Sequence, residues 1–286
     1  MDASELLRQG KLNEALAALQ NQIRSDPSNA KLRTFLFQLL CVMGQWERAL
    51  TQLSVAAEID SKALLMKEVC QQAVQCEALR KEIFAGKKLP LVFGQPQEWV
   101  GWMIQANQQS AQGHYGEAQA LREKALEAAP AVAGHINTSQ FEWVADADPR
   151  MGPILEAMIQ GRYFWIPLSN INQIKIDKPV DLRDVIWAPA NFVWTNGGAA
   201  VGFIFARYPG SDEVEDAGVR LGRKTDWIER SPDFATPVGQ RLFATNEAEY
   251  PMLEVRALTL GEPIVPSTDR EGAAGEGAVG EGAVHG

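Results

Sequence analysis

Apolar residues recur every three or four positions between Ala3 and Ala129, as in Leu12, Leu16 and Leu19. This spacing gives a helix one apolar stripe, so it predicts that the N-terminal part of the chain is helical. Gly86 to Pro96 mixes glycine, lysine and proline with apolar residues, and it predicts a loop between helices. Beyond this part the helical spacing fades while Trp, Val, Ile, Phe and Pro become more frequent. A β-rich region is therefore expected to follow.

One short block repeats within the helical part. Gly10-Lys-Leu-Asn-Glu-Ala-Leu16 returns as Gly44-Gln-Trp-Glu-Arg-Ala-Leu50, and a related block, Gly113-His-Tyr-Gly-Glu-Ala-Gln119, lies two periods further on. The interval from Gly10 to Gly44 is the period of tetratricopeptide repeats, in which each unit is a helical hairpin. The glycine ends one helix, and the alanine lets the next helix approach its neighbour closely. Stacked hairpins form a curved surface that usually binds another protein.

The ends of the second helices are also marked. Pro27 and Pro130 follow the glycines of their blocks at the same distance, and Asp60 occupies nearly the corresponding place after Gly44. Near residue 78, where a third block would fall, the sequence has no glycine-aromatic pattern. We therefore predict one longer helix from Ser61 to Phe84 in place of a regular repeat.

The C-terminal half has the composition of strands, with one predicted exception, a short helix over Met151–Gln160. The sharpest local prediction is a hairpin, because Asn196-Gly197 is a preferred pair for a type I′ turn between two strand-forming runs. The runs that we expect to be extended are Arg162–Pro167, Ile171–Ile176, Asn191–Thr195, Gly198–Phe205, Asp226–Glu229, Gln240–Thr245 and Leu253–Leu260.

These patterns predict an α+β chain of four segments. Residues 1–133 form a tetratricopeptide-like array of helical hairpins, 134–149 a linker, 150–260 a mostly antiparallel β-rich domain, and 261–286 a disordered tail. The tail repeats Glu-Gly-Ala units, which hold too little apolar surface to form a core.

Charge and cysteine usage narrow the classes of function. The net charge is −9, so the phosphate backbone of a nucleic acid would be repelled, and we expect no nucleic-acid partner. Cys41, Cys70 and Cys76 have neither disulfide-framework nor zinc-site spacing. The first residues lack a basic stretch followed by an apolar one, and no run is apolar enough to span a membrane. These features predict a soluble, cytoplasmic protein without membrane insertion.

Catalytic signatures are weak. Gly275-Glu-Gly-Ala-Val-Gly280 matches the dinucleotide-binding pattern, but it follows no strand and belongs to the tail repeat, so it lacks the context that the motif requires. His114, His135 and His285 are far apart in the chain. We therefore predict a non-enzymatic protein without catalytic, metal-binding or cofactor-binding residues.

Two groups of residues are candidates for binding. In the helical part, a partner would contact the inner helices, and the residues chosen for this role are Arg33, Phe37, Gln38 and Cys41. In the β-rich part, arginines and aspartates lie among aromatic residues, and they are either buried ion pairs or a pocket for an anionic ligand. The residues of that possible pocket are Arg162, Asp184, Arg207 and Asp226.

Four tryptophans of the β-rich part are predicted to lie in its core, although one or two could instead be exposed anchors for a partner. They are Trp165, Trp187, Trp194 and Trp227.

A series of motifs in the second half resembles the ImpE family, also called the SciE or TagJ family. In chain order they are Arg162-Tyr-Phe-Trp-Ile-Pro, Asp181-Leu-Arg-Asp-Val-Ile-Trp-Ala-Pro-Ala, Asn196-Gly-Gly, Ala206-Arg-Tyr-Pro-Gly-Ser, Leu221-Gly-Arg-Lys-Thr-Asp-Trp and Leu253-Glu-Val-Arg-Ala-Leu. The resemblance, with the helical repeats in front, extends to Leu260.

The resemblance implies a cytoplasmic adaptor of the bacterial type VI secretion system. Its implied partners are the N-terminal helix of the TssB-type small sheath subunit and the ClpV-type ATPase that disassembles the contracted sheath. A groove of stacked hairpins is a suitable receptor for such a helix. An enzyme or small-anion receptor that uses the arginines and aspartates of the second domain is the alternative.

Overall fold

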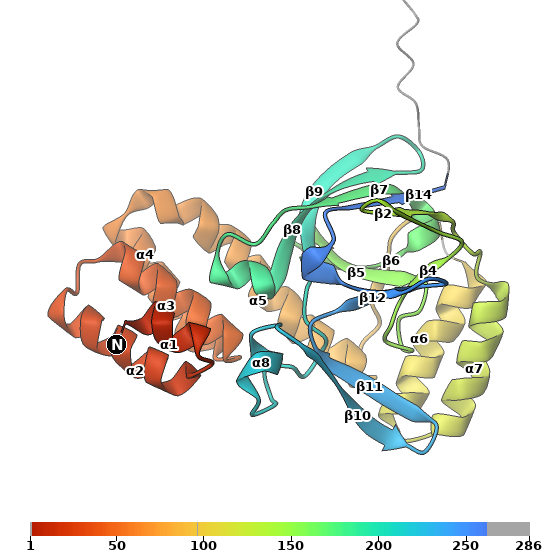
Figure 1. Cartoon of the computed structure of the whole chain (residues 1–286), viewed down its shortest axis with the longest axis horizontal. Helices are drawn as coiled ribbons and strands as arrows, with labels where there is room; N and C mark the ends of the chain where they lie inside the picture. The colour runs from red at the N-terminus through yellow and green to blue at the C-terminus, as the bar shows by residue number, and fades with distance from the viewer. Residues whose placement is uncertain (1, 96, 262–286) are drawn as a thin grey trace, which may run out of the picture.

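The computed structural model describes residues 2–95 and 97–261 and has the expected α+β architecture. Two helical hairpins lie at one end of the molecule, and the strands form the other part (Figure 1). The expected disorder of the tail concerns residues that lie outside the described ones, apart from Gly261. The four helices of the two hairpins are α1 (Ala3–Arg8), α2 (Leu12–Ser25), α3 (Ala30–Val42) and α4 (Trp46–Ile59).

The repeated block has the local geometry that its sequence predicts. Gly10, Gly44 and Gly113 all have positive φ, between 70° and 83°, which glycine adopts without steric cost directly after a helix. The alanines five positions later, Ala15, Ala49 and Ala118, are fully buried where the two helices of a hairpin approach each other. Each block therefore forms a helical hairpin.

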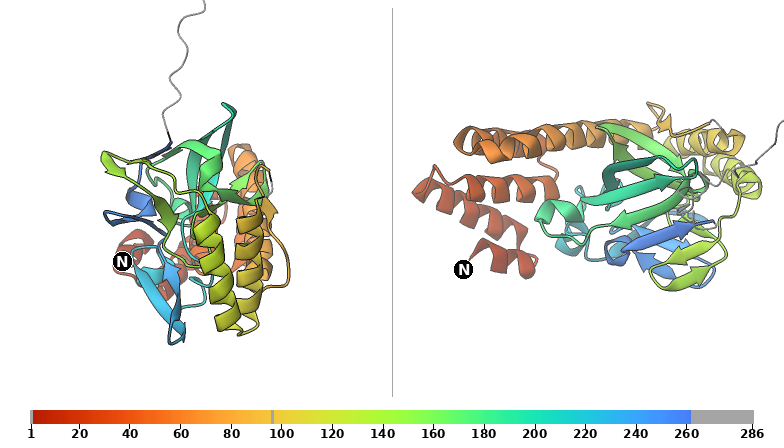
Figure 2. Two further views of the ribbon diagram at one scale, coloured as in Figure 1. Left: turned by 90° about the vertical axis from the view of Figure 1, so that its right-hand side faces the viewer. Right: turned by 90° about the horizontal axis from the view of Figure 1, so that it is seen from above.

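The third hairpin is separated from the first two. A 3-10 turn, η1 (Ser61–Ala63), leads into the long helix α5 (Leu64–Phe84), which confirms the predicted extended helix. This helix runs along the sheet to its far side, where α6 (Glu98–Ala111) and α7 (Tyr115–Ala128) pack (Figure 2). Among the described residues, no helix is long and apolar enough to cross a membrane.

The strands form a nine-stranded sheet in the order β1-β6-β5-β9-β8-β7-β14-β2-β3, a three-stranded sheet β13-β12-β4 and a hairpin β10-β11. Within the described ranges, every pairing of these strands is antiparallel except that of β1 with β6. The strands are β1 (Leu91–Val92), β2 (Gly134–Ile136), β3 (Ser139–Phe141), β4 (Val144–Asp146), β5 (Ile154–Ile159), β6 (Arg162–Pro167), β7 (Ile171–Ile176), β8 (Trp187–Trp194), β9 (Ala199–Phe205), β10 (Thr225–Ser231), β11 (Phe234–Gly239), β12 (Leu242–Thr245), β13 (Glu249–Pro251) and β14 (Ala257–Leu260).

The remaining short elements are η2 (Leu168–Asn170), η3 (Leu182–Val185), α8 (Ala217–Arg220) and η4 (Met252–Glu254). Of these, η3 packs against α3 and so joins the β-rich part to the second hairpin.

Two predictions about element type were wrong. The helix expected over Met151–Gln160 is strand β5, whose six residues are all buried, so the run shows no polar alternation that would mark it as a strand. The expected linker 134–149 contains β2, β3 and β4, which pair with β14 and β12. The predicted loop over Gly86–Pro96 does connect α5 to α6, and its described residues include the two-residue strand β1.

The predicted hairpin exists as β8 and β9, but its turn is not type I′. Gly197 has a φ of 83°, whereas Asn196 is not among the residues with positive φ, and type I′ needs both. The Trp194 carbonyl accepts from Gly197 N at 2.9 Å, and Trp194 N donates to the Gly198 carbonyl at 2.8 Å. The connection is therefore longer than a two-residue turn.

The core continues from the helices into the strands. One cluster of buried side chains includes Phe37 and Leu39 of α3 together with Trp165 of β6 and Trp187 of β8. A second cluster lies wholly within the β-rich part. The helical and β-rich parts therefore share one hydrophobic core instead of meeting across a polar boundary.

Candidate functional site

Arginines of the β-rich part hold the first two hairpins. Arg223 donates from Nη1 to the Arg8 carbonyl and from Nη2 to the Leu7 carbonyl, both at 2.9 Å, at the end of α1. Arg207 donates from Nη1 to the Val42 carbonyl at the end of α3, at 3.0 Å. The last carbonyls of a helix lack partners within it and carry the negative end of the helix dipole. These guanidinium groups therefore fix where α1 and α3 lie on the β-rich part.

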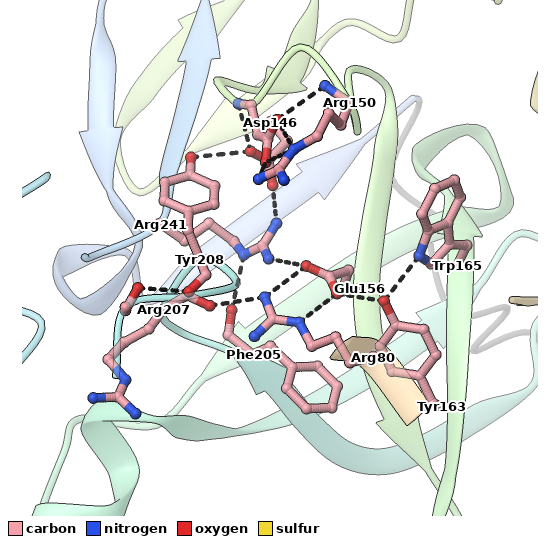
Figure 3. A network of polar contacts seen from close by, with 12 residues as sticks. Arg80, Asp146, Arg150, Glu156, Tyr163, Trp165, Phe205, Arg207, Tyr208 and Arg241 are labelled. Carbon is pink, nitrogen blue, oxygen red and sulfur yellow. Dashed lines mark hydrogen bonds and ion pairs between the residues drawn. The ribbon is translucent and has the colours of Figure 1, made fainter. Parts of the chain in front are cut away.

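A buried ion network holds α5 in a similar way (Figure 3). Arg80 donates from Nε and Nη2 to the two oxygens of Glu156 at 2.6 and 2.8 Å, and Nη2 also donates to the Arg207 carbonyl at 2.8 Å. The Tyr163 hydroxyl donates to Glu156 and accepts from Trp165 Nε1. A bidentate pair fixes the direction of the guanidinium as well as its distance. The network therefore fixes the position of α5 on β5 and β6.

A second buried arginine extends this network into β12 and β4. Arg241 donates to Glu156 and to Asp146, and its Nε donates to the Phe205 carbonyl. The Tyr208 hydroxyl donates to Asp146 at 3.0 Å. The side chains of Arg241 and Glu156 have no exposed surface, and that of Asp146 is 1 % exposed. The described residues thus cover these charged groups against a substrate, and the role of the network is to join elements that are distant in sequence.

Burial alone would raise the pKa of Glu156, but the charges of Arg80 and Arg241 outweigh it and lower that pKa to about 2. Burial raises the pKa of Asp146 to about 6, although Arg241 opposes the shift. Arg80 also pairs with Glu77 at 3.4 Å and Arg241 with Asp146, but Glu156 is the carboxylate that pairs with both arginines. Glu156 is therefore the anion on which the network depends.

The sequence analysis did not select Arg80, Glu156, Arg241 or Asp146. One signal was available, because Glu156 is a single carboxylate inside the otherwise apolar run Ile154-Leu-Glu-Ala-Met-Ile159. A charged residue in such a run is almost never fully buried unless it is paired. The arginines that pair with it come from α5 and from the residue just before β12, and no sequence spacing connects them to β5.

The four residues considered for a pocket in the β-rich part do not meet. Asp184 is buried, and its Oδ2 accepts from the backbone of Val180 and Asp181, so it holds the start of η3. Arg207 is buried and holds α3, as described above. Both side chains are therefore structural.

The other two lie elsewhere and are more exposed. The Arg162 guanidinium lies 5.5 Å from the ring centre of Phe164, and Asp226 forms an ion pair with Lys224 at 2.8 Å. The prediction of a common pocket for Arg162, Asp184, Arg207 and Asp226 was wrong. Of the predicted core tryptophans, Trp165, Trp187 and Trp194 are buried, whereas Trp227 is 47 % exposed.

Of the residues chosen on the helical part as partner contacts, Phe37 and Cys41 lie on the covered side of α3. Phe37 and Cys41 have no exposed surface, and Gln38 is 6 % exposed with its side-chain oxygen accepting from Leu182 N at 3.2 Å. Arg33 is half-buried and donates to the Pro27 carbonyl at 3.0 Å. The choice of Phe37 and Cys41 is corrected, because the core of this protein covers them. Gln38 lines a groove, but the protein's own η3 segment covers most of its side chain.

The open face of α3 is the adjacent stripe. Lys31, Thr34, Phe35 and Gln38 follow the i, i+3, i+4, i+7 spacing of one helix face and line a groove of about 430 Å³. Val180, at the edge of this groove, is 90 % exposed. We call this the α3 groove, and its other lining residues are Ser4, Ala30, Asp60, Ala63, Asp181 and Leu182.

A second groove, of about 520 Å³, lies between α5 and strands β8 and β9. Val69 and Gln72 line it from the helix, and Asn191 and Val201 line it from the strands. Val201 is 72 % exposed.

Comparison with known proteins places this architecture in a family. The profile described as ImpE protein matches residues 138–259, and a tetratricopeptide repeat profile matches residues 6–71. A Pseudomonas aeruginosa protein described as "Type VI secretion system accessory component TagJ" is 52 % identical over 258 residues, which is 90 % of each chain. The chain belongs to the ImpE family.

The crystal structure of protein VPA1032 from Vibrio parahaemolyticus has a similar fold. It matches with a TM-score of 0.82 and 25 % identity, over 92 % of this chain and 98 % of that chain. The ImpE-family resemblance read from the motifs of the second half is thus confirmed, and the arrangement of helical hairpins on a β-rich part occurs in a second protein.

Proposed function

We propose that this ImpE-family chain is a cytoplasmic accessory component of a bacterial type VI secretion system and acts there as a non-catalytic adaptor. The 52 % identity to a relative described as TagJ supports the system. The adaptor role is supported by an array of helical hairpins whose α3 groove is not filled by any described part of the chain. The polar network buries its charged groups, which is consistent with a structural role for them.

The α3 groove is the proposed receptor for the N-terminal helix of the TssB-type small sheath subunit. Phe35, Ala63 and Leu182 are apolar residues that line it, and an amphipathic helix would lay its apolar face against them. Lys31 is a cation at the rim, and Asp60 is an anion there. The proposal therefore specifies a helix that is apolar on one side. The ClpV-type ATPase is the second proposed partner, which the adaptor links to the sheath.

Calorimetry with a peptide covering the first helix of the sheath subunit tests this proposal. The full chain should bind the peptide saturably. Thr34→Arg and Val180→Asp should each weaken binding about tenfold or more, since each places a charge against the apolar face of the bound helix.

Val201→Asp is the matched control, because it makes the same change as Val180→Asp at an exposed valine in the second groove. It should leave the affinity unchanged. Absence of binding by the full chain would refute the helix-receptor function. Normal binding by both α3-groove variants, with weakened binding by Val201→Asp, would move the receptor to the groove beside α5.

A further inference from the structure

Strand β10 has an unpaired edge. In the part of the chain that the structure describes, its seven residues pair only with β11, and β11 in turn packs against α7 through Phe234. The β10–β11 hairpin lies at the rim of the molecule (Figure 1). Trp227, in the middle region of β10, is 47 % exposed. A long free edge that carries a large exposed side chain is open to pairing with another strand.

The register of the hairpin shows which backbone groups of β10 face this free edge. Gln240 N donates to the Lys224 carbonyl at 2.9 Å, and hydrogen-bonded positions alternate along an antiparallel pair. Pro237 lies opposite Trp227 and agrees with this alternation, because proline has no N–H to donate to β10. The residues whose N–H and C=O groups point away from β11 are therefore Thr225, Trp227 and Glu229.

The sequence of this edge is complementary to itself. Two antiparallel β10 strands can form hydrogen bonds only where residues that face the free edge lie opposite each other. Trp227 opposite Glu229 of a second copy satisfies this condition. The same register places Ile228 opposite Ile228 of the second copy. It also places Asp226 opposite Arg230 of the second copy, once at each end of the contact.

Neighbouring registers lack this match. A shift of two residues in one direction places Glu229 opposite Glu229 of the second copy, and a shift in the other direction places Lys224 opposite Arg230. Like charges directly opposite each other on paired strands are destabilising. The charges of the edge therefore select the register that is centred on Ile228.

The two charged side chains lie on the same face of β10. Arg230 Nε donates to Thr236 Oγ1 at 2.9 Å, and Thr236 lies opposite Ile228, so the Arg230 side chain is on the Ile228 face in spite of a bulge in this part of the hairpin. Asp226 is two residues before Ile228 and faces the same way. Its Oδ2 pairs with Lys224 at 2.8 Å, and its side chain is 48 % exposed. The Asp226 carboxylate is therefore accessible to a second cation.

We propose that β10 is the edge through which two copies of this chain associate, in an antiparallel β10–β10 contact centred on Ile228. A two-fold contact uses the same surface on both copies, as this edge allows. The contact joins the two hairpins into one sheet. Seven residues a side are fewer than the roughly 20–30 of a stable interface, so a weak, reversible dimer is expected.

Sedimentation equilibrium of the full chain over a range of concentrations tests the proposal. The unmodified chain should dimerise reversibly. Asp226→Arg and Arg230→Asp each place like charges opposite each other at both ends of the contact, so each should weaken dimerisation about tenfold. An equal mixture of the two variants should recover the affinity of the unmodified chain, because opposite charges face each other again in the mixed dimer.

Glu249→Arg is the matched control. It reverses the same charge at an exposed position of β13, which is the edge strand of another sheet, and it should leave dimerisation unchanged.

A chain that stays monomeric at the highest concentration reached would overturn the proposal and leave the β10 edge to a strand of a different protein. Equal weakening by Glu249→Arg would also overturn it, since net charge alone would then be the cause. Failure of the mixture to recover the affinity would overturn the register. The peptide-binding test of the α3 groove is a separate measurement, so failure of one proposal leaves the other intact.

Discussion

The first two hairpins and the third share the same sequence block at the turn between their helices, but they pack in different ways. The α1–α4 hairpins meet the β-rich part through helix ends held by Arg207 and Arg223. The α6–α7 hairpin packs through its side. The ring centre of Tyr115 lies 5.5 Å from that of Phe234, and the Arg122 guanidinium lies 4.3 Å from the Phe234 ring centre. A repeated block thus specifies a hairpin, while residues outside the block decide what the hairpin packs against.

The long helix α5 connects these two arrangements, so the strongest test acts on its attachment. Glu156→Gln should lower the free energy of unfolding by about 3–5 kcal/mol, because Arg80 and Arg241 would both lose their shared buried counter-charge. Urea unfolding measures the loss. The control is Glu5→Gln, which removes an exposed ion pair with Arg8 and should leave stability unchanged. Similar losses for the two variants would show that the network does not hold α5.

The same carboxylate predicts a pH dependence. The pKa of Glu156 is lowered to about 2 in the folded chain. Its contribution to the free energy of unfolding is therefore complete above the unfolded-state pKa near 4.5 and is lost as pH falls through the folded-state pKa. The expected loss is about 3 kcal/mol over that interval. Between pH 5 and pH 3, the free energy of unfolding of the unmodified chain should fall more steeply than that of Glu156→Gln. Parallel slopes would contradict the ion-pair interpretation.

Asp146 should act in the opposite direction. Its pKa is raised to about 6 in the folded chain. Its contribution to the free energy of unfolding is therefore complete below the unfolded-state pKa near 3.8 and is lost as pH rises through about 6. Asp146→Asn should therefore flatten the stability profile between pH 4 and pH 6. An unchanged profile in that interval would show that Arg241 keeps this carboxylate ionised throughout.

Substitutions at the equivalent alanine of each hairpin test whether the three hairpins are packed alike. Ala15→Trp, Ala49→Trp and Ala118→Trp should each cost about 1–3 kcal/mol, because all three positions are fully buried between paired helices and would be overpacked. Thermal melts should show similar losses of stability for the three variants. Ala17→Trp on the exposed face of α2 should have little effect. A neutral result at Ala118 alone would show that the third hairpin does not share the packing of the others.

The smallest effect is expected where an arginine holds a helix end near the surface. Arg223→Gln should cost about 0.3–1 kcal/mol, as is usual for a cation at a helix C-terminus. Amide exchange within α1 should accelerate while exchange within α7 stays constant. Lys178→Gln, an exposed change that leaves α1 untouched, is the comparison. Equal acceleration in α1 and α7 would mean that Arg223 acts on the whole fold instead of on one hairpin.

The sequence by itself determined the local elements. Glycines at fixed spacing set the helical hairpins, and branched and aromatic runs produced most of the strands, because these signals act over a few residues. The all-apolar run of β5 was misread as a helix, since a strand covered on both faces has no alternation. The motifs of the second half also identified the family.

Only the tertiary structure decided which surfaces are open and which charges are paired. Phe35 and Phe37 both lie on apolar stretches of α3, yet Phe37 is fully buried in the core and Phe35 faces the groove. Glu156 and Arg241 are 85 residues apart in the chain and meet in the core. Helical periodicity describes one helix at a time, whereas burial depends on which distant segment covers each face.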